Sequence, residues 1–235
     1  MIKLYKGDCL VEMDKIEDKS IDMILCDLPY GITECDWDVA LPFDKLWEQY
    51  KRVIKDNGAI VLFAKQPFTS KLILSNEKMY KYNLIWKKDN HDNPLNAKKR
   101  FLNITEDIVI FYKRQCTYNP QGLIPYNKMI KQGGGKSLVI RSDRAPEVFQ
   151  QWTNYPRNIL EFKRDFPMVH PTQKPVALLE YLIKTFTNEG MVVLDNCMGS
   201  GSTGVAAMNL GRDFIGIEMT DKYYDIAKGR MNYKE

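Results

Sequence analysis

The 235-residue chain contains no long apolar run. No stretch approaches about 18 consecutive apolar residues, the length that a membrane-spanning helix requires. The opening residues, MIKLYKGDCL, also lack the apolar segment and the small-residue cleavage site of a secretory signal peptide. We therefore expect a cytoplasmic protein with no membrane partner.

Cysteine is scarce, and its spacing gives no sign of metal binding. The five cysteines are odd in number and form no Cys-x-x-Cys pair. Several lie in apolar, strand-like runs, which favours reduced and buried thiols over disulfides or a zinc site. We therefore predict no metal centre. The cysteines are Cys9, Cys26, Cys35, Cys116 and Cys197.

A large excess of one charge is also missing, because the net charge is only +4. The charge is unevenly spread, however. Residues 81–174 contain 17 Lys and Arg against 8 Asp and Glu, so their net charge is +9 and that of the remainder is −5. A basic middle suits a polyanionic partner such as nucleic acid. A solvated basic surface explains the same numbers, and charge alone leaves both interpretations open.

Apolar runs that are typical of buried strands recur along the chain. Most are continuous rather than alternating, which favours strands covered on both faces. We expect strands at residues 2–9, 20–27, 58–64, 82–88, 106–113, 190–197 and 213–219.

Two segments carry apolar residues at helical spacing. FDKLWEQYKRVIKDNG (43–58) ends at Asn57-Gly58, a helix C-cap signal. KPVALLEYLIKTFTNEG (174–190) begins with Pro175 in the first turn and ends at Gly190. The alternation of strands and helices predicts an α/β fold with a doubly wound, mostly parallel sheet.

The segment 114–165 interrupts this alternation. It contains glycines, prolines, aromatics and basic residues without a strand or helix pattern, so we expect an inserted subdomain rather than part of a sheet. Its GGGKS run (133–137) lacks the earlier glycine of a phosphate-binding loop, because position 130 is Ile. No strand leads into the run, and we interpret it as a flexible loop.

The stretch VVLDNCMGSGSTG (192–204) has the arrangement of a nucleotide-type binding site. One strand ends at Asp195, glycines follow at the G-x-G-x-x-G spacing, and the next strand ends at Glu218, 23 residues after Asp195. Glycines allow a sharp turn and close approach of a ligand, and an acid ending the second strand can bind ribose hydroxyls. Dinucleotides and S-adenosylmethionine share this arrangement, so the pattern does not separate them.

Asp27-Leu28-Pro29-Tyr30 lies at the carboxyl end of another expected strand, where ligands of open α/β sheets bind. The exocyclic amine of a nucleobase is a poor nucleophile, because its lone pair is delocalised into the ring. Asp27 and a main-chain carbonyl beside Pro29 could accept hydrogen bonds from this amine, and Tyr30 offers a stacking face. A turn with a capping acid explains the four residues equally well.

The HPTQKP segment (170–175) precedes the second helical pattern. A helix entry capped by Thr172 or Gln173 accounts for Pro175 in the first turn. That explanation does not account for His170 or Lys174.

DLPYG, HPTQKP and DNCMGSGSTG, in this order, resemble the motifs of amino-methylating DNA methyltransferases of the permuted β group, in which the catalytic motif precedes the cofactor motif. The resemblance includes LYKGDCLVEMDKI and YPRNILEF (155–162) and covers nearly the whole chain outside 114–165. It implies a Rossmann-like, S-adenosyl-L-methionine-dependent fold with circularly permuted motif order. Residues 1–113 and 166–235 would form the catalytic domain, and residues 114–165 the target-recognition insertion.

The resemblance also implies roles for individual residues. Asp27, Pro29 and Tyr30 would hold a base flipped out of double-stranded DNA, and its amine would attack the methyl group directly and in line. The other implied positions bind S-adenosyl-L-methionine. These are Asp8 and Cys9 at the adenine, Asp195, Gly199, Ser200 and Gly201 around the methionine part, Glu218 at the ribose, Thr172 and Lys174 at the carboxylate, and Asp27 again.

The chain departs from the family pattern at two places. Leu28 replaces the usual second-position proline of the catalytic motif, and Asn196-Cys197 replaces Pro and Phe of the glycine motif. An acid at position 27, where related enzymes also use serine, favours adenine N6 over cytosine N4, which stays an alternative.

Double-stranded DNA is the partner that the resemblance implies, in a bacterium or a phage-infected cell. A homodimer and a cognate restriction endonuclease are further partners to test. A nicotinamide-dependent oxidoreductase would leave residues 27–30 and 170–175 unexplained. A methyltransferase of RNA or of protein glutamine would place its catalytic motif after the cofactor motif, and an inactive DNA-binding protein would not need the acid in the pocket.

Overall fold

A computed structural model describes residues 1–31, 40–92, 94–131, 147–166 and 173–233 of the protein. The chain divides into two compact units. The first comprises Met1–Asn119 and Asn158–Glu235, and the second comprises Pro120–Arg157.

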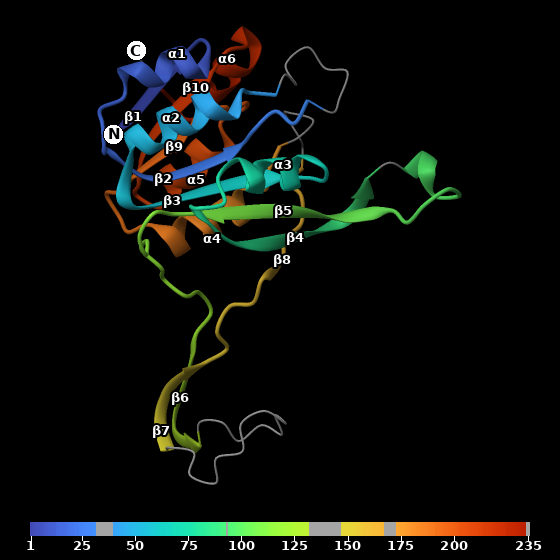
Figure 1. Ribbon diagram of the computed structural model, residues 1–235, viewed down its shortest axis with the longest axis vertical. Coiled ribbons are helices and arrows are strands. Elements are labelled where there is room, and N and C mark those ends of the chain that lie inside the picture. The colour runs from blue at the N-terminus through green and yellow to red at the C-terminus, as the bar shows by residue number, and fades with distance from the viewer. Residues whose placement is uncertain (32–39, 93, 132–146, 167–172, 234–235) are drawn as a thin grey trace. The chain divides into compact units, whose positions relative to one another are not determined.

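An eight-stranded sheet forms the centre of the first unit (Figure 1). Its strands are β1 (Ile2–Lys6), β2 (Ile21–Asp27), β3 (Ile54–Ala64), β4 (Tyr80–Asp92), β5 (Asn103–Phe111), β8 (Ile159–Glu161), β9 (Val192–Asp195) and β10 (Asp213–Glu218). They lie in the order β1-β10-β9-β2-β3-β5-β4-β8. Only β5 runs antiparallel to its neighbours β3 and β4, and the other adjacent strands pair in parallel. The predicted α/β class and mostly parallel sheet are confirmed.

Helices flank this sheet. They are α1 (Cys9–Glu12), α2 (Phe43–Val53), α3 (Phe68–Ser75), α4 (Val176–Phe186), α5 (Ser202–Asn209) and α6 (Asp221–Arg230), with short 3-10 turns at η1 (Met13–Lys15) and η2 (Pro94–Asn96). No helix in the described part of the chain is both long and apolar enough to cross a membrane.

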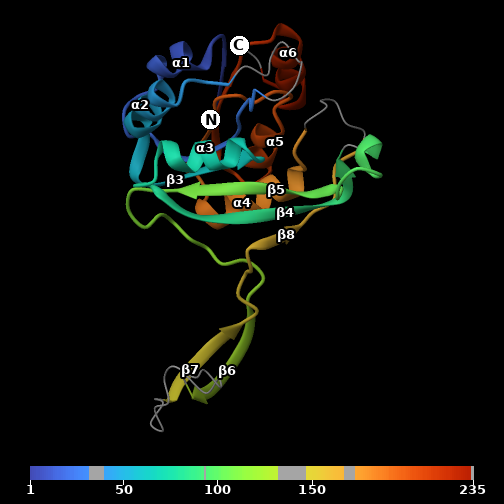
Figure 2. The ribbon, with the colours of Figure 1, turned by 45° about the vertical axis from the view of Figure 1, so that its right-hand side comes forward.

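The continuous apolar strands are explained by helices on both faces of the sheet. On β3, Val61 and Phe63 belong to the core that contains residues of α4, α5 and α6. Ile60 and Leu62 belong to the opposite core, with residues of α1, α2 and α3. Successive strand residues point to opposite faces, so a strand between two helical layers buries every side chain. Figure 2 shows α3 and α4 on opposite sides of β3 and β5.

Each expected strand of the main sheet is present, but two expected helix ends were wrong. The helix expected over 174–190 is α4, which ends at Phe186 instead of Gly190, because Thr187 already has extended backbone. The helix predicted over 43–58 ends with α2, and Asn57-Gly58 lies inside β3 instead of forming a C-cap. Ile54 already has extended backbone and is only 3% exposed, so burial of this β-branched residue in the sheet outweighs the turn signal. Gly58 has a packing role, because a Cβ atom there would lie 2.9 Å from the carbonyl oxygen of Asp22.

The second unit contains a hairpin of β6 (Ile124–Lys131) and β7 (Glu147–Thr153), paired in antiparallel fashion. A separate unit does lie within 114–165, but the expectation that this segment forms no part of a sheet was wrong, because β6 and β7 pair with each other and β8 joins the main sheet. Met129 is 58% exposed and its cross-strand partner Phe149 is 57% exposed. No buried face imposed an alternating pattern on these strands. The GGGKS run lies outside the described residues.

The β4–β5 hairpin extends from the main sheet (Figure 1). β4 is longer than the 82–88 strand expected from the sequence, and it reaches Asp92. Residues 94–102 connect it to β5 and include the η2 turn. Because β5 runs opposite to β3, this connection lies at the edge of the sheet where β2 and β3 end.

Candidate active site

Most predicted site residues gather in one cavity of about 820 Å³ at the carboxyl ends of the parallel strands. Ligands of open α/β sheets bind at this edge, and the volume is typical of small-molecule sites. Of the predicted site residues, Gly201 is described but does not line the cavity, and Thr172 lies outside the described part of the chain. The predicted residues in the lining are Asp8, Cys9, Asp27, Pro29, Tyr30, Lys174, Asp195, Gly199, Ser200 and Glu218.

Asp27 ends β2 and is held by Tyr30, three residues later. The Tyr30 hydroxyl donates to Asp27 Oδ1 at 2.7 Å and lies 3.1 Å from Glu106 Oε1. One side of the Tyr30 ring packs against Phe68, with ring centroids 4.9 Å apart and planes inclined by 31°. Burial raises the pKa of Tyr30 well above its ordinary value, so the phenol stays a neutral donor.

Lys174 joins Asp27 to Glu106. Its ammonium contacts Asp27 Oδ2 and lies 2.9 Å from Glu106 Oε1. Glu106 is 7% exposed and pairs through its other oxygen with Lys88, also at 2.9 Å. The Lys174 ammonium further lies 4.9 Å from the centre of the Phe63 ring. We had expected Lys174 at the cofactor carboxylate, but the structure places it on the two acids.

The two acids of this cluster have opposite electrostatic surroundings. Burial raises the pKa of Asp27 above its ordinary value; Lys174 opposes this effect and the negative Glu106 adds to it. Burial also acts to raise the pKa of Glu106, but Lys174 and Lys88 outweigh it, so that pKa is lowered. Two cations thus stabilise Glu106 as an anion, whereas Asp27 has one cation and a neighbouring anion. Asp27 is the better proton acceptor of the pair.

Leu28, the departure from the family motif, is explained by packing. Its side chain is 3% exposed and belongs to the core beneath α1, α2 and α3. An apolar side chain buried at this position anchors the turn by packing, where proline would restrict the backbone itself.

Asp195 ends β9 and closes the glycine-rich turn. Its Oδ2 accepts a hydrogen bond from Thr203 Oγ1 at 2.6 Å, and its Oδ1 accepts one from the Cys197 amide at 3.1 Å. Burial raises the pKa of Asp195 to about 6, against these hydrogen bonds, which favour the ionised form. The carboxylate thereby ties the first residues of the turn to α5.

Glu218 ends β10 and holds the other side of the turn. Its Oε2 accepts from the Gly199 amide at 3.0 Å and its Oε1 from the Thr220 amide at 2.8 Å. Gly201 follows in the left-handed region, with φ of +78°, and caps α5. Both Glu218 oxygens thus hold backbone amides of the turn, and each ionised oxygen keeps a second lone pair for a further donor.

Gly204 provides a direct test of how tightly this turn is packed. A Cβ atom there would lie 2.2 Å from Met231 Sδ and 2.8 Å from Phe214 Cε1. We expect Gly204→Ala to lower the free energy of unfolding by about 1–3 kcal/mol through overpacking. Thermal unfolding followed by circular dichroism measures it. The control is Gly229→Ala in α6, which has nothing within 4 Å of the added Cβ and should not be destabilising.

Asp8 and Cys9 lie at the start of α1. Asp8 Oδ1 accepts from the Leu10 amide at 2.9 Å and caps the helix, which shortens the strand expected over 2–9. A hydrogen bond with the thiol of Cys197 lowers the pKa of Cys9, whereas burial raises that of Cys26 to about 12. The described cysteines are free thiols, buried at Cys9, Cys26 and Cys116 and partly exposed at Cys197.

The sequence comparison decides the family. A model of the DNA methylase family, which groups N6 and N4 amino-methyltransferases, matches residues 21–229. The chain belongs to this DNA methylase family.

The methylase is also similar to two relatives and to two solved structures. It is 30% identical to the DNA adenine methyltransferase YhdJ of Escherichia coli K12, over 97% of this chain and 82% of that protein. It is 28% identical to the Type II methyltransferase M1.MboII of Moraxella bovis, over 99% of this chain and 97% of that protein. The M1.HpyAVI–SAM complex is 26% identical with a TM-score of 0.67, covering 98% of this chain and all of that one. The methylase shares the fold of the cytosine-N4-specific PvuII methyltransferase. The two are 16% identical, with a TM-score of 0.69 over 97% of this chain and 86% of that one.

The methylase uses S-adenosyl-L-methionine as its cofactor and DNA as its substrate. The cavity fits such a group, because a turn held by Glu218 and Asp195 lines one side and the rest combines apolar side chains with acidic ones and with lysines, of which Lys88 and Lys174 are paired with acids. Acidic side chains favour a cationic sulfonium. The family match therefore answers the question between dinucleotide and S-adenosylmethionine that the glycine pattern left open.

Sequence reasoning missed two members of the ion-pair cluster around Asp27. Glu106 and Lys88 come from the antiparallel strands β5 and β4, which carry none of the family motifs named above. The available signal was an acid inside an apolar strand, in TEDIVIF (105–111). A buried acid requires a charged or hydrogen-bonding partner, and this one has two lysines.

Proposed function

We propose that this methylase methylates the N6 amine of adenine in double-stranded DNA after flipping the base out of the helix. The observation that carries the proposal is the Asp27 carboxylate, held by Tyr30 and Lys174 on the wall of the cofactor cavity. An acid in the first position of the motif favours adenine. The name of the Escherichia coli relative, a DNA adenine methyltransferase, agrees with this choice.

Asp27 would activate the amine by accepting one of its N–H hydrogens. Tyr30 and Lys174 occupy one acceptor position on each carboxylate oxygen, and each ionised oxygen has a second. A main-chain carbonyl beside Pro29 would accept the other hydrogen. Two fixed acceptors favour a tetrahedral nitrogen, which withdraws its lone pair from conjugation with the ring and raises its nucleophilicity; this is electrostatic preorganisation.

Tyr30 would supply the stacking surface for the flipped base. Phe68 covers one side of the Tyr30 ring and fixes its plane, which leaves the other face for a base. Stacking on an aromatic ring contributes about 1–3 kcal/mol per base. This contribution offsets the few kcal/mol that unstacking from the duplex requires.

The cofactor supplies an electrophilic methyl group when it is bound. The amine loses one N–H proton as it gains the methyl group, and Asp27 is positioned to take it at the carboxylate oxygen that accepts that N–H. Its raised pKa favours this role, while Lys174 keeps the carboxylate ionised beforehand. We assign Lys174 and Glu106 as positioning residues for Asp27, and no longer place Lys174 on the cofactor.

The remaining predicted residues are proposed as cofactor ligands. Glu218 would accept from the ribose hydroxyls, the turn from Asp195 through Gly199, Ser200 and Gly201 would surround the methionine part, and Asp8 and Cys9 would line the adenine site. Thr172 stays a prediction.

Glu218→Gln tests the ribose assignment. A hydrogen bond to a charged group contributes about 1.5–3 kcal/mol, so the dissociation constant of S-adenosyl-L-methionine should rise about tenfold to a hundredfold. Calorimetric titration of the cofactor measures this. Glu180→Gln serves as the control, since Glu180 bonds Asn209 on the surface. An unchanged affinity of the Glu218 variant would remove the residue from the site.

We also propose the second unit, residues 120–157, as the core of the target-recognition segment predicted at 114–165. Its hairpin exposes a mixture of apolar and aromatic side chains with a lysine, which suits groove contacts with DNA. These exposed residues are Ile124, Tyr126, Lys128, Met129, Val148 and Phe149. A restriction endonuclease as companion rests on the Type II designation of the Moraxella relative. Cytoplasmic location and a homodimer stay predictions.

Transfer of labelled methyl groups from S-adenosyl-L-methionine to unmethylated bacterial DNA tests the proposed function. Nucleoside chromatography of the product should show N6-methyldeoxyadenosine. A label in N4-methyldeoxycytidine would support the cytosine alternative instead. No transfer to DNA by the folded, cofactor-binding protein would contradict both.

A further inference from the structure

The tip of the β4–β5 hairpin, residues 94–102, combines three consecutive cations with two exposed apolar side chains. Lys98, Lys99 and Arg100 are all exposed. Leu95 is 94% exposed and Phe101 is fully exposed. This hairpin tip belongs to the same unit as the catalytic cavity.

The cations of the tip differ from those nearer the sheet. On β4, Lys88 pairs with Glu106 and Asp92, and Lys87 pairs with Glu161. Among the described residues, no carboxylate forms an ion pair with Lys98, Lys99 or Arg100. Three adjacent unpaired cations repel one another and favour a multivalent anion.

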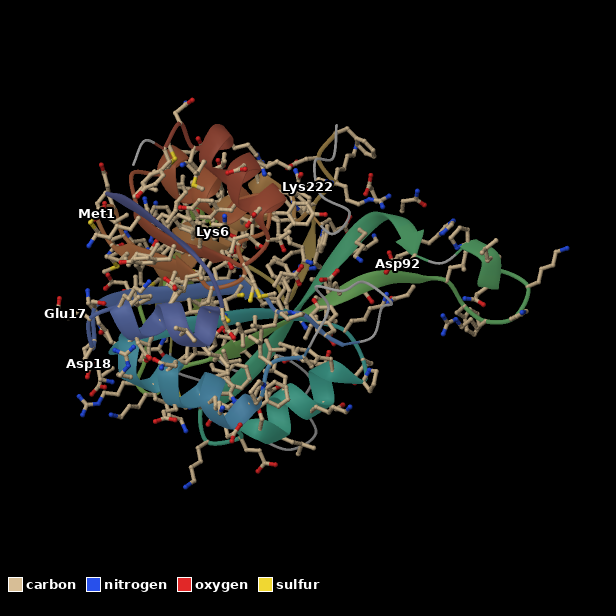
Figure 3. The ribbon with its side chains drawn as sticks, turned by 90° about the horizontal axis from the view of Figure 1, so that it is seen from above. Met1, Lys6, Glu17, Asp18, Asp92 and Lys222 are labelled. Atoms are coloured by element: carbon tan, nitrogen blue, oxygen red, sulfur yellow. The ribbon has the colours of Figure 1, made fainter. Side chains whose placement is uncertain are left out.

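The hairpin tip adjoins the catalytic cavity. A neighbouring cavity of about 410 Å³ is lined by Arg100 and Phe101 of the tip and by Glu106. Lys65, Asp92 and Glu106 line both cavities. Figure 3 shows Asp92 at the end of β4, where the hairpin continues outward. A duplex whose base enters the catalytic cavity would therefore pass beside the tip.

We infer that the hairpin tip is a second DNA-contact surface, which binds the duplex next to the flipped base. Lys98, Lys99 and Arg100 bind backbone phosphates, and Phe101 contacts the step that loses its stacking partner. Proteins that distort DNA commonly place apolar side chains at unstacked steps. Solvated lysines would explain the charge but not a fully exposed phenylalanine beside it at the cavity edge. The inference rests on the proposed function and adds the surface that holds the duplex during transfer.

The salt dependence of DNA binding tests this surface. The probe is a fluorescent random-sequence duplex titrated at several salt concentrations, with the triple variant Lys98→Gln/Lys99→Gln/Arg100→Gln. Each phosphate contact contributes about 0.9 to the slope of log affinity against log salt, so the slope should decrease by about 2–3. In the transfer assay, the KM for DNA should rise tenfold or more, and kcat should stay within about twofold, because phosphate contacts are made equally in ground and transition states.

The matched control removes three cations from the other end of the hairpin. Lys78→Gln/Lys81→Gln/Lys113→Gln changes net charge equally, lies outside the proposed target-recognition segment and should leave the salt slope near that of the wild type. Lys99→Gln alone should lower the slope by about one, which keeps the test valid if the triple variant loses stability. Phe101→Ala should weaken duplex binding without changing the slope.

Several outcomes would overturn the inference. An unchanged slope and KM in the triple variant would show that the tip does not touch DNA. Equal competition by polyglutamate for the tip would indicate an acidic protein partner. If the wild type transfers no methyl group to DNA but the triple variant still loses slope, the proposed function fails while the contact surface stands.

Discussion

Asp27→Asn is expected to lower kcat for methyl transfer to DNA by about 10²–10⁴, the range associated with the loss of one positioned proton acceptor. The amide keeps the size of the side chain and can still accept from Tyr30 through its oxygen. It presents N–H donors where the carboxylate presented lone pairs, and it faces the ammonium of Lys174. The amine of the base thereby loses its charged acceptor at the moment it attacks.

Single-turnover transfer with saturating DNA and cofactor separates this effect from binding. The dissociation constant of S-adenosyl-L-methionine should change only a fewfold, so the loss lies in kcat. Asp56→Asn is the matched control, because Asp56 forms surface pairs with Lys19 and Lys113 away from the cavity. Full activity of the Asp27 variant would refute the assignment of the pocket.

Lys174→Met is expected to have the second large effect, on both stability and pH dependence. Removal of one partner from a buried ion pair typically costs about 3–5 kcal/mol, and here it leaves Asp27 and Glu106 beside each other without the shared cation. Activity requires ionised Asp27 and falls as pH decreases through its pKa. Lys174 lowers this pKa more than the hydrogen bond from Tyr30 does, so without Lys174 the acid limb of the kcat profile should move to higher pH.

Urea unfolding and the pH profile of kcat measure the two effects. Adding Glu106→Gln to Lys174→Met removes the second negative charge, so it should recover part of the stability and return the acid limb toward lower pH. Lys55→Met breaks the more exposed pair with Asp22 and should cost less than about 1 kcal/mol. An acid limb that stays in place in the Lys174 variant would mean that this lysine supports folding alone.

The sequence predicted the parts of this site that stand at the ends of parallel strands. Asp27, Asp195 and Glu218 each end an apolar run, and parallel strands of a doubly wound sheet end at one edge. Their convergence therefore followed from local patterns combined with one topological rule. The chemical roles proposed for them rest on the family resemblance and the order of the motifs.

The partners of Asp27 could not be predicted in the same way. Glu106 reaches the cavity because β5 runs antiparallel between β3 and β4, a pairing that no local pattern specifies. The Asn57-Gly58 signal failed for a related reason, because burial of Ile54 in the sheet overrides a local turn preference. The exposed hairpin of β6 and β7 has no buried face and hence no alternation to detect. Long-range pairing and surface strands are the features that a single sequence specifies least.

The reversed direction of β5 also places the hairpin tip and the cluster around Asp27 at different positions along the same two strands. Glu106 and Lys88 lie on adjoining strands, a few residues before β4 ends at Asp92 and the hairpin tip, residues 94–102, begins. The β4–β5 pairing shifts register between Lys87 and Asp92, so the two strands already differ in length beyond Glu106. Residues inserted beyond this shift would lengthen the hairpin and leave Glu106 in its place in the sheet. The outer part of the β4–β5 hairpin is thus a spacer of variable length. Changing its length would change the distance along the duplex between the flipped base and the phosphates that the hairpin tip binds.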